Sequence, residues 1–461
     1  ADFFDIFYIG ESETEYFHLM DLYKEYKAKS LSRKEFLHDA AKIPGIYVPS
    51  LYEVTYKEDG TIESFAPVCS DIPAVIEKQI VMDVTDTYYP KAPVVPFIRA
   101  TQDRVVLEIQ RGCIRGCRFC QAGMLYRPLR ERDLSMLKDY AITMLKNTGH
   151  EEISLSSLSS SDYSELAGIV NFLIEHCEGQ GINISLPSLR IDAFSLDVMS
   201  KVQDIKKSSL TFAPEAGSQR MRNVINKGLT EEDILRGSGE AFAGGWNKVK
   251  LYFMLGLPTE EDIKGIAYLA EKIAEHYYEI PKDQRNGKCQ ITVSTSFFVP
   301  KPFTPFQWAP MNTHEEFLGK AYTVNHTIKD QLNKKSIKYN WHEADVTLLE
   351  GLLARGDRRV GRTILKAYEN GALYDAWSET FHYDIWLKAM EETGISYDFY
   401  NFRTRTFDEI LPWDFIHIGV TRKFLEREWE RAKQGIVTPN CRQGCSGCGG
   451  RSYGGGVCYE D

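Results

Sequence analysis

The sequence predicts an α/β protein whose central part is a parallel sheet curled into a partial barrel of six strand–helix units, a (β/α)6 arrangement. Between residues 101 and 310, short apolar runs alternate with longer amphipathic segments. Strands joined through helices become parallel, so a series of such units builds a parallel sheet. The connections are short, as in compact domains of this class. A loop with three closely spaced cysteines follows the first strand of the series.

The individual elements follow from the length and period of the apolar pattern. Strands are expected at 104–110, 152–157, 182–187, 208–213, 248–255 and 290–298. Helices are expected at 133–147, 162–178, 195–204, 230–243 and 260–278. Barrels of parallel strands place their chemistry in the loops that follow the carboxyl ends of the strands. The loops after these six strands are therefore the places to look for a site.

The whole chain is expected to divide into five consecutive parts. Residues 1–28 combine an apolar run, a glycine turn and a helical pattern, which predicts the remnant of a Rossmann-like domain or an N-terminal extension packed on the core. Residues 29–100 are expected to form a linker and hairpin region. The central part, 101–310, precedes a mostly helical region, 311–435. The last part, 436–461, is rich in glycine and cysteine and too short to hold a core.

Net charge, hydropathy and cysteine usage limit the classes of function that the protein can have. The 461 residues carry a net charge of −10, so there is no global basic field to hold nucleic acid, although a local patch could do so. No apolar run is long enough to span a membrane. Seven of the ten cysteines fall in two tight clusters, which indicates metal ligation in a reducing, cytoplasmic compartment and not a disulfide framework. The chain begins at Ala1, which is consistent with processing or truncation.

The first cysteine cluster is the strongest chemical signal. In the stretch Arg111-Gly-Cys-Ile-Arg-Gly-Cys-Arg-Phe-Cys120, Cys113, Cys117 and Cys120 have the spacing C-x3-C-x2-C. Three thiolates leave one coordination position open, where a structural zinc site or a fully protein-ligated iron–sulfur cluster needs four. A zinc knuckle is the alternative.

This loop resembles the C-x3-C-x-φ-C signature of radical S-adenosylmethionine (SAM) enzymes, with Phe119 as the aromatic residue. The resemblance implies a TIM-type partial barrel and a [4Fe–4S] cluster on the three cysteines. It also implies that the open iron binds the amino and carboxylate groups of SAM, and that Phe119 lies close to this cofactor. One electron from an external reductant would cleave SAM to methionine and a 5′-deoxyadenosyl radical.

Two later loops supply polar candidates for SAM. Ser156 and Ser157 follow the second strand and offer hydroxyl and backbone donors, although nearby residues also suit a helix cap. By position they correspond to the family's loop that meets the SAM amino group. Arg190 follows the third strand and could bind the SAM carboxylate or a substrate phosphate with two hydrogen bonds. A surface ion pair is the alternative for Arg190.

The fourth and fifth strands lead into further candidates. Glu215 lies in Phe212-Ala-Pro-Glu-Ala-Gly-Ser-Gln-Arg220, and a carboxylate there can accept two hydrogen bonds from a ribose diol. The stretch resembles methylthiotransferase-type cores, in which an acidic or polar residue holds the SAM ribose. Gly256 and Leu257 follow the fifth strand and resemble the segment whose backbone contacts adenine. Turn chemistry alone would also explain the glycine.

Two groups outside the barrel complete the candidates. Arg355, Arg358, Arg359 and Arg362 lie within eight residues and predict either a weak substrate-phosphate patch or ion pairs with the many carboxylates, the second being slightly favoured. Cys441, Cys445, Cys448 and Cys458 supply four thiolates for a second, closed metal site. Their spacing fits a second iron–sulfur cluster and a structural zinc equally well, and a disordered tail is the remaining alternative.

Residues 1–435 together resemble the uncharacterised radical SAM proteins that carry an N-terminal B12-binding domain. The string Asp-x-His-x-x-Gly of that domain's loop does not occur, so the resemblance leaves cobalamin open. The predicted function is reductive cleavage of SAM followed by methylation or thiolation of an RNA, a protein or a small molecule. A non-catalytic iron–sulfur or zinc protein that scaffolds a complex or carries electrons is the alternative.

Overall fold

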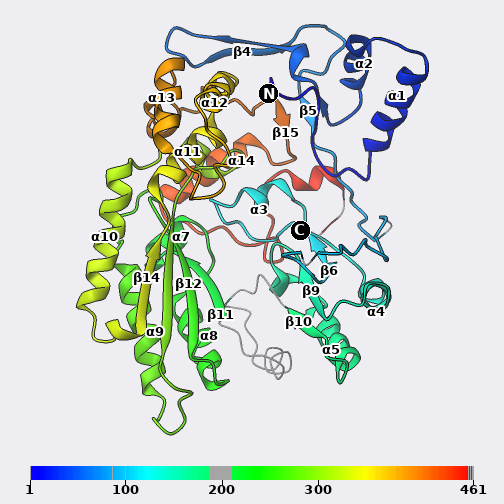
Figure 1. Cartoon of the computed structure of the whole chain (residues 1–461). Helices are drawn as coiled ribbons and strands as arrows, with labels where there is room; N and C mark the ends of the chain where they lie inside the picture. The colour runs from blue at the N-terminus through cyan, green and yellow to red at the C-terminus, as the bar shows by residue number, and fades with distance from the viewer. Residues whose placement is uncertain are drawn as a thin grey trace. The chain divides into compact units, whose positions relative to one another are not determined.

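The computed structural model describes residues 2–454 except 86, 99, 186–190 and 192–209, together with residues 456 and 458. The chain forms two compact units (Figure 1). The first unit comprises residues 1–81, 298–318 and 343–429. The second comprises residues 82–297, 319–342 and 430–461. Each unit is therefore assembled from three separate stretches, and the chain changes unit at five places in the sequence.

The second unit contains a parallel sheet in the order β10–β9–β6. Its strands are β6 (Val105–Glu108), β9 (Glu152–Ser156) and β10 (Asn183–Ser185). Apolar side chains of the strands pack against α4 (Leu134–Thr148) and α5 (Leu166–Cys177) in one buried cluster. Glu108 is aligned with Ser156, so β6 and β9 end at the same edge. The loops that follow these two strands consequently start side by side.

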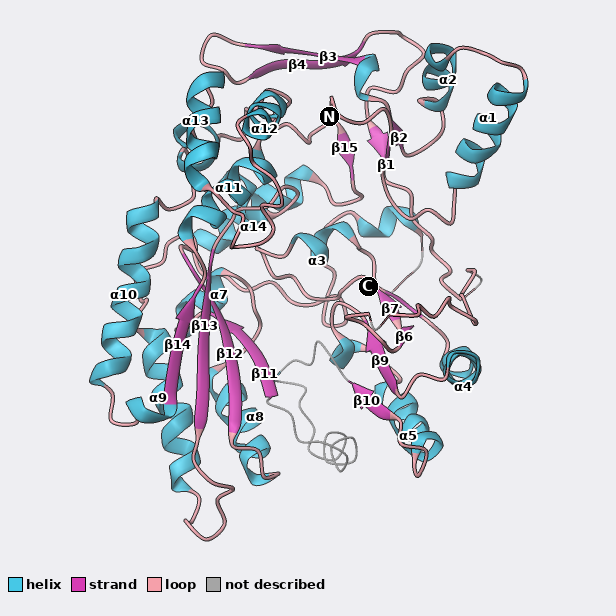
Figure 2. Cartoon of the chain, in the orientation of Figure 1, coloured by secondary structure: helices cyan, strands magenta, loops and turns pink. Residues whose placement is uncertain are grey.

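A second parallel sheet of the same unit has the order β11–β12–β13–β14 (Figure 2). Its strands are β11 (Leu210–Glu215), β12 (Lys248–Leu255), β13 (Gln290–Phe297) and β14 (Ile337–Trp341). Helices α7 (Gln219–Val224), α8 (Glu231–Ala243) and α9 (Gly265–Glu279) connect the strands. Burial alternates along β12, as expected where the two faces of a strand meet different surroundings. Glu215 is aligned with Phe253 after a register shift, which places the ends of β11 and β12 together.

The six predicted strands are present, and the parallel α/β fold class is confirmed. The expected helix at 195–204 lies outside the described residues. The structure adds β14, a further parallel strand that the sequence pattern missed because it lies in the region expected to be helical. Helix α5 begins at Leu166 and not at 162, because residues Ser160–Asp162 form a separate 3₁₀ turn.

The first unit opens with short strands and two helices. Strand β1 (Phe7–Tyr8) pairs antiparallel with β2 (Ile46–Tyr47), and α1 (Tyr16–Ala28) and α2 (Arg33–Ala40) lie between them in sequence. A Rossmann-like unit would place this first strand in a parallel sheet. The pairing observed is antiparallel, and the segment packs in a buried cluster of its own unit. The Rossmann-like remnant at 1–28 and the packed N-terminal extension both stay predictions.

The rest of the first unit is an antiparallel hairpin, a short parallel pair and a group of helices. The hairpin is β3 (Tyr52–Tyr56) with β4 (Ile62–Pro67), and β5 (Ile76–Glu77) pairs with β15 (Ile416–His417). Helices α11 (Ala344–Arg355), α12 (Val360–Glu369) and α13 (Tyr383–Thr393) share a buried cluster. Two further long helices, α10 (His314–Asp330) and α14 (Arg422–Lys433), begin in the first unit and continue into the second. The helical character expected for 311–435 is thus present, interrupted by β14 and β15.

Candidate active site

The three-cysteine loop connects β7 (Gln110–Arg111), which pairs with β8 (Arg130–Glu131), to the short helix α3 (Gln121–Leu125). Gly112 has a φ of 87°, and a Cβ there would lie 2.5 Å from the carbonyl oxygen of Tyr126. Only glycine allows the chain to turn at this point. The turn directs the following residues, beginning with Cys113, away from the strand.

Backbone N–H groups already point at two of the sulfur atoms in the loop. The N–H of Arg115 donates to Sγ of Cys113 over 3.4 Å, and the N–H of Gly123 donates to Sγ of Cys120 over 3.3 Å. The N–H of Cys120 donates to the carbonyl of Cys117 over 3.1 Å, which closes the loop on itself. Hydrogen bonds of this kind stabilise thiolates and are a feature of iron–sulfur ligation.

All three cysteine side chains are half-buried. Burial, together with the nearby Cys117, Asp162 and Cys120, raises the pKa of the Cys113 thiol to about 12. Burial also raises the pKa of Cys120, with Cys117 adding to the effect. Buried thiols that oppose one another's ionisation become thiolates when a cation binds among them. The donor set therefore fits a metal centre.

The loop after β9 contacts the cysteine loop through an ion pair. Asp162 is buried and accepts hydrogen bonds from both Nε and Nη2 of Arg115, the first over 2.9 Å. The hydroxyl of Ser159 donates to the same carboxylate over 2.7 Å. Because Arg115 lies between two of the cysteines, this pair fixes the cysteine loop against the serine-rich loop.

The two predicted serines lie at this junction. Ser156 ends β9, and its carbonyl accepts a hydrogen bond from the N–H of Ile109 over 3.1 Å. The Ser157 hydroxyl lies 3.0 Å from that of Ser160. Both residues are half-buried, so their polar groups lie near the surface beside the cysteine loop.

Glu215 occupies the end of β11 in an unusual conformation. Its φ is 68°, a region that non-glycine residues seldom adopt and that is often found at functional sites. Its Oε1 lies 3.3 Å from Nζ of Lys227, and both side chains are largely buried. The same Nζ lies 5.9 Å from the centre of the Phe119 ring. Lys227 thus links the predicted ribose carboxylate to the aromatic residue that precedes Cys120.

The turn after β12 is held by a buried carboxylate. Gly256 has a φ of 88°, and its N–H donates to Oε2 of Glu260 over 2.8 Å. Nζ of Lys320 lies 2.8 Å from the same oxygen. Burial raises the pKa of Glu260, and these two donors offset part of the shift. Leu257 is buried next to the glycine.

The predicted site residues therefore gather at the carboxyl ends of β6, β9, β11 and β12. The contacts above connect the cysteine loop with the serine loop and with Glu215, and Gly256 follows the strand that pairs with β11. Arg190 lies outside the described residues. Sequence reasoning did not predict the roles of Arg115, Asp162 and Lys227. The arginines interleaved with the cysteines were a usable signal, whereas nothing in the sequence marked Lys227.

Two stretches of the chain match models of known protein families. Residues 107–270 match the family described as the radical SAM superfamily, and residues 1–49 match the family described as radical SAM proteins, N-terminal. An uncharacterized protein of Methanocaldococcus jannaschii is 32% identical over 336 residues, which cover 70% of this chain and 70% of that protein. The chain belongs to the radical SAM superfamily. Radical SAM proteins cleave SAM reductively, and the chain is accordingly an enzyme.

Further similarities fall within the same superfamily. A putative methylthiotransferase of the same organism is 25% identical over 166 residues, covering 34% of this chain and 36% of that protein. The radical SAM methyltransferase TsrM from Kitasatospora setae, solved with cobalamin and a [4Fe–4S] cluster, has a TM-score of 0.45 at 12% identity, covering 84% of this chain and 77% of that chain. The cobalamin-dependent SAM radical enzyme OxsB has a TM-score of 0.37 at 12% identity, covering 84% and 55%.

Radical SAM membership implies a [4Fe–4S] cluster and SAM, and the cysteine loop fits both. Three thiols, two of which accept backbone N–H donors, match a cluster that keeps one iron open. In addition, Oε1 of Gln110, on the strand that leads into the loop, is buried and makes no hydrogen bond within the protein. A buried acceptor of this kind calls for a donor from a ligand or from water.

The predicted arginine patch has a structural role for most of its members. Arg355 is fully buried and donates to the carbonyls of Tyr400 and Pro300. Arg358 donates to carbonyls and a hydroxyl of the hairpin region, and Arg359 forms an ion pair with Asp357. These guanidinium groups make contacts inside the first unit, and the substrate-phosphate patch stays a prediction. Arg362 is half-buried on α12.

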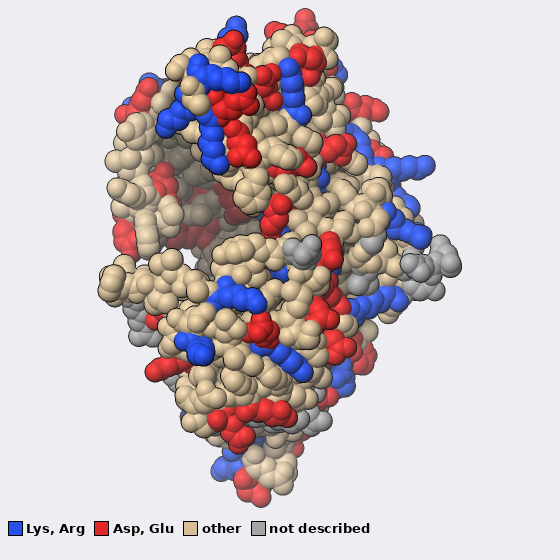
Figure 3. All heavy atoms as spheres, turned by 90° about the vertical axis from the view of Figure 1, so that its right-hand side faces the viewer, with Lys and Arg blue, Asp and Glu red and all other residues tan. Residues whose placement is uncertain are grey.

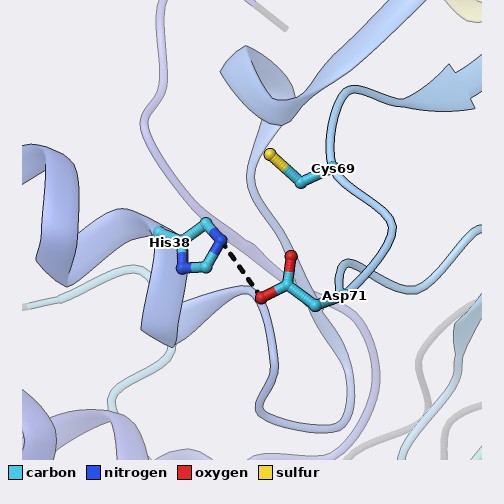
Figure 4. Close-up of side chains that lie close together, drawn as sticks. All are labelled: His38, Cys69 and Asp71. Atoms are coloured by element: carbon cyan, nitrogen blue, oxygen red, sulfur yellow. Dashed lines mark ion pairs between the residues drawn. The ribbon is translucent and has the colours of Figure 1, made fainter.

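His38, Cys69 and Asp71 form a cluster that the sequence did not predict. Their ligand atoms lie within 4.8 Å of one another, and Nε2 of His38 lies 3.3 Å from Oδ2 of Asp71 (Figure 4). Nζ of Lys42 lies 3.1 Å from the same oxygen. An ammonium group at that position competes with a cation, and Asp71 is exposed. We therefore interpret the group as a surface ion-pair network.

The surface carries both signs of charge. On the face drawn in Figure 3, basic and acidic side chains are interspersed over the coloured residues, without a large area of one sign. This distribution agrees with the net charge of −10. Within the described part of the chain, no helix has the length and apolar character that a membrane span needs.

Proposed function

We propose that this radical SAM enzyme methylates or thiolates a carbon centre of an RNA, a protein or a small molecule in the cytoplasm, with electrons from an external one-electron reductant. The observation that carries the proposal is the set of contacts that joins the three-cysteine loop to the Asp162 loop and, through Lys227, to Glu215 at the end of β11. The similarity to a putative methylthiotransferase supports the class of reaction.

Cys113, Cys117 and Cys120 would hold the cluster, which when bound supplies the electron that cleaves the sulfonium bond of SAM. The chain's own residues position the reactants. The Arg115–Asp162 ion pair fixes the loop, and half-burial of the cysteines limits access of water. Arg115, which lies between Cys113 and Cys117, therefore acts as a positioning residue.

Glu215 would orient SAM by accepting hydrogen bonds from the ribose hydroxyls. Lys227 holds this carboxylate next to Phe119, which brings the ribose and the cluster to one place. The N–H groups around Gly256 and Leu257 would contact the adenine, and Ser156 and Ser157 the amino group. Arg190 remains a proposed ligand of the SAM carboxylate.

The charge of the protein bears on the class of substrate. A net charge of −10 and mixed surface charge argue against tight nonspecific binding to RNA, because phosphate contacts dominate such affinity. A protein, a small molecule or an RNA bound through local contacts remains within the proposal. The proposal does not include cobalamin as a cofactor, since the sequence lacks the Asp-x-His-x-x-Gly string of B12-binding domains.

The proposal is tested with protein reconstituted anaerobically with iron and sulfide. Under reducing conditions we expect equal amounts of methionine and 5′-deoxyadenosine from SAM, and an electron paramagnetic resonance (EPR) signal of the reduced cluster that SAM perturbs. Changing Cys113, Cys117 and Cys120 together to Ala should abolish both. Methyl-labelled SAM incubated with fractions of RNA, protein and small molecules identifies the acceptor class.

Replacing Glu215 tests the SAM site separately from the cluster. Glu215→Gln should raise the SAM concentration that gives a half-maximal EPR change about tenfold or more, because a hydrogen bond to a charged group contributes about 1.5–3 kcal/mol. Glu275→Gln, on the exposed side of α9, is the matched control and should leave it unchanged. A reduced cluster that ignores SAM would favour the scaffold or electron-transfer alternative, as would a colourless zinc protein.

A further inference from the structure

The C-terminal tail is attached directly to the three-cysteine loop. Nη2 of Arg118, which lies between Cys117 and Cys120, donates to the carbonyl of Ile436 over 2.6 Å. The N–H of Cys441 donates to the carbonyl of Ile114 over 3.1 Å. Because Ile114 follows Cys113, the first tail cysteine is fixed by a backbone hydrogen bond next to the first cysteine of the loop.

Asn226 fixes the same segment from another side. Its Nδ2 donates to the carbonyls of Gly116 and Thr438 over 3.0 and 3.1 Å, and its Oδ1 accepts from the N–H of Thr438 over 2.9 Å. Arg442 adds an ion pair with Glu131 at 2.7 Å. Residues 436–442 are therefore docked on the three-cysteine loop and its neighbours.

The four tail cysteines surround one pocket. Cys441, Cys445, Cys448 and Cys458 all line a cavity of about 350 Å³, together with glycines of the same segment. Gly447 and Gly449 have φ values of 63° and 106°, which bend the chain around this space. A segment with little core of its own thus encloses a space lined by sulfur.

The tail repeats the hydrogen-bond pattern of the first loop. The N–H of Gly447 donates to Sγ of Cys445 over 3.4 Å, and the N–H of Gly450 donates to Sγ of Cys448 over 3.4 Å. In the first loop, Arg115 makes the same contact with Cys113, two residues earlier. Both sets of cysteines thus present sulfur atoms that backbone donors have prepared for negative charge.

The distances between the sulfur atoms distinguish a site for an iron–sulfur cluster from a site for a single zinc ion. Two thiolates on one tetrahedral zinc lie about 3.8 Å apart, since the Zn–S bond is about 2.3 Å. Among the described cysteines of the tail, no three sulfur atoms lie within 4.8 Å of one another, and the same holds for Cys113, Cys117 and Cys120. As they stand, the sulfur atoms of each set are therefore too far apart for three of them to bind a single zinc ion.

Arg127 lies between the two sets of cysteines. Its guanidinium is buried and donates to the carbonyls of Gly123 and Arg115 over 3.0 and 2.8 Å. A Cβ at Gly450 would lie 3.5 Å from Sγ of Cys448 and 3.9 Å from Cβ of Arg127, so Arg127 also lies beside the tail cysteines. A buried cation at this position would compensate the negative charge of two thiolate-ligated centres.

We propose that the tail binds a second [4Fe–4S] cluster through Cys441, Cys445, Cys448 and Cys458, next to the SAM-binding loop, with Arg127 between the two. Four thiolates close this site, so it has no iron open to SAM. The site goes beyond the proposed reaction, since it assigns a second metal centre whatever the substrate is.

The experiment measures iron, sulfide and zinc per chain in anaerobically prepared protein, with Mössbauer spectra. We expect about eight irons for the wild type and about four after Cys441, Cys445 and Cys448 are changed together to Ala. The remaining cluster should keep its SAM-perturbed EPR signal, which separates this test from that of the proposed function. Cys69→Ala, at an exposed cysteine outside both sets, is the control and should keep about eight.

Two further variants keep the test decisive if the triple variant does not fold. Cys458→Ser removes a thiolate with little change in shape and should convert or labilise only the second cluster. Arg127→Gln should lower the reduction potentials seen in an EPR titration, because a positive charge is lost. One zinc per chain in place of the extra irons would overturn the proposal. About four irons in the wild type without zinc would also overturn it.

Discussion

Buried arginines hold the loops of the site at the level of single residues. Arg222 is fully buried and donates to the carbonyls of Ala216, Gly217 and Leu229 over 3.1–3.2 Å. Arg118 does the same for the carbonyls of Asn223 and Val224. Loops have few backbone partners of their own, and a guanidinium group supplies several donors in a fixed geometry. The cysteines are thus positioned by a rigid surround.

The contacts of Glu108, at the end of β6, lead us to expect that the stability of the protein depends on pH. It accepts hydrogen bonds from Arg111 over 3.0 Å and from Arg132 over 2.6 Å. Burial raises the pKa of its carboxyl, but the two guanidinium groups lower it more, so the folded-state pKa lies below the ordinary 4.5. The folded state then binds fewer protons than the unfolded chain. Its contribution is present above the unfolded-state pKa and is lost as pH falls through the folded-state pKa.

The measurement is the free energy of urea unfolding of the metal-free protein at a series of pH values from about 7 to about 3. Glu108→Gln should flatten the acid limb of this profile relative to the wild type. Glu53→Gln, at an exposed position on β3, should reproduce the wild-type slope. Parallel profiles for the wild type and Glu108→Gln would contradict the assignment.

At the scale of helices and strands, the packing of neighbouring elements depends on single positions where two backbones come into close contact. Gly217 joins β11 to α7, and a Cβ there would lie 2.1 Å from the backbone nitrogen of Ile266 at the start of α9. Gly217→Ala should therefore separate these elements and destabilise the protein by about 2–4 kcal/mol. It should also weaken SAM binding, since Glu215 lies two residues earlier.

Gly319 provides the matched comparison in the same chemical unfolding experiment. It lies on the exposed side of α10, and a Cβ there would meet nothing within 4 Å. Gly319→Ala should be neutral or stabilise the protein by up to about 1 kcal/mol, because alanine is the better helix former. Equal effects of the two substitutions would show that the close approach at Gly217 does not matter.

The sequence predicted those elements whose pattern is local. Apolar runs located all six strands, because each strand contributes apolar side chains to the parallel sheets. β14 was missed, since Ile337-Lys-Tyr-Asn-Trp341 mixes polar and apolar residues within a region of helical pattern. The cysteines carried their own signal, whereas Lys227 and Asn226 acquire their roles only through contacts far along the chain. The spacing of cysteines in the sequence predicts metal ligands, but it does not predict which other residues position those cysteines.

The whole molecule is organised differently from a series of consecutive domains. Each compact unit takes three stretches of the chain, so the central region expected at 101–310 is not a complete unit. It lacks β14, which pairs with β13 from Ile291–Ile337 to Thr295–Trp341. It also lacks the tail residues that accept the hydrogen bonds of Arg118 and Asn226.

We therefore expect a protein of residues 101–310 alone to aggregate or to remain loosely folded. Without β14, strand β13 presents unpaired N–H and C=O groups along its length, which invites pairing between molecules. Arg118 and Asn226 also lose the acceptors that the tail supplies, the carbonyls of Ile436 and Thr438, at a cost of about 1–3 kcal/mol for each group left unsatisfied. Size-exclusion chromatography and the urea unfolding curve, run beside the full chain, measure this. A monomeric fragment that unfolds in one cooperative step would contradict the expectation, because it would mean that the region is stable without the stretches that complete its sheet and cover its cysteine loop.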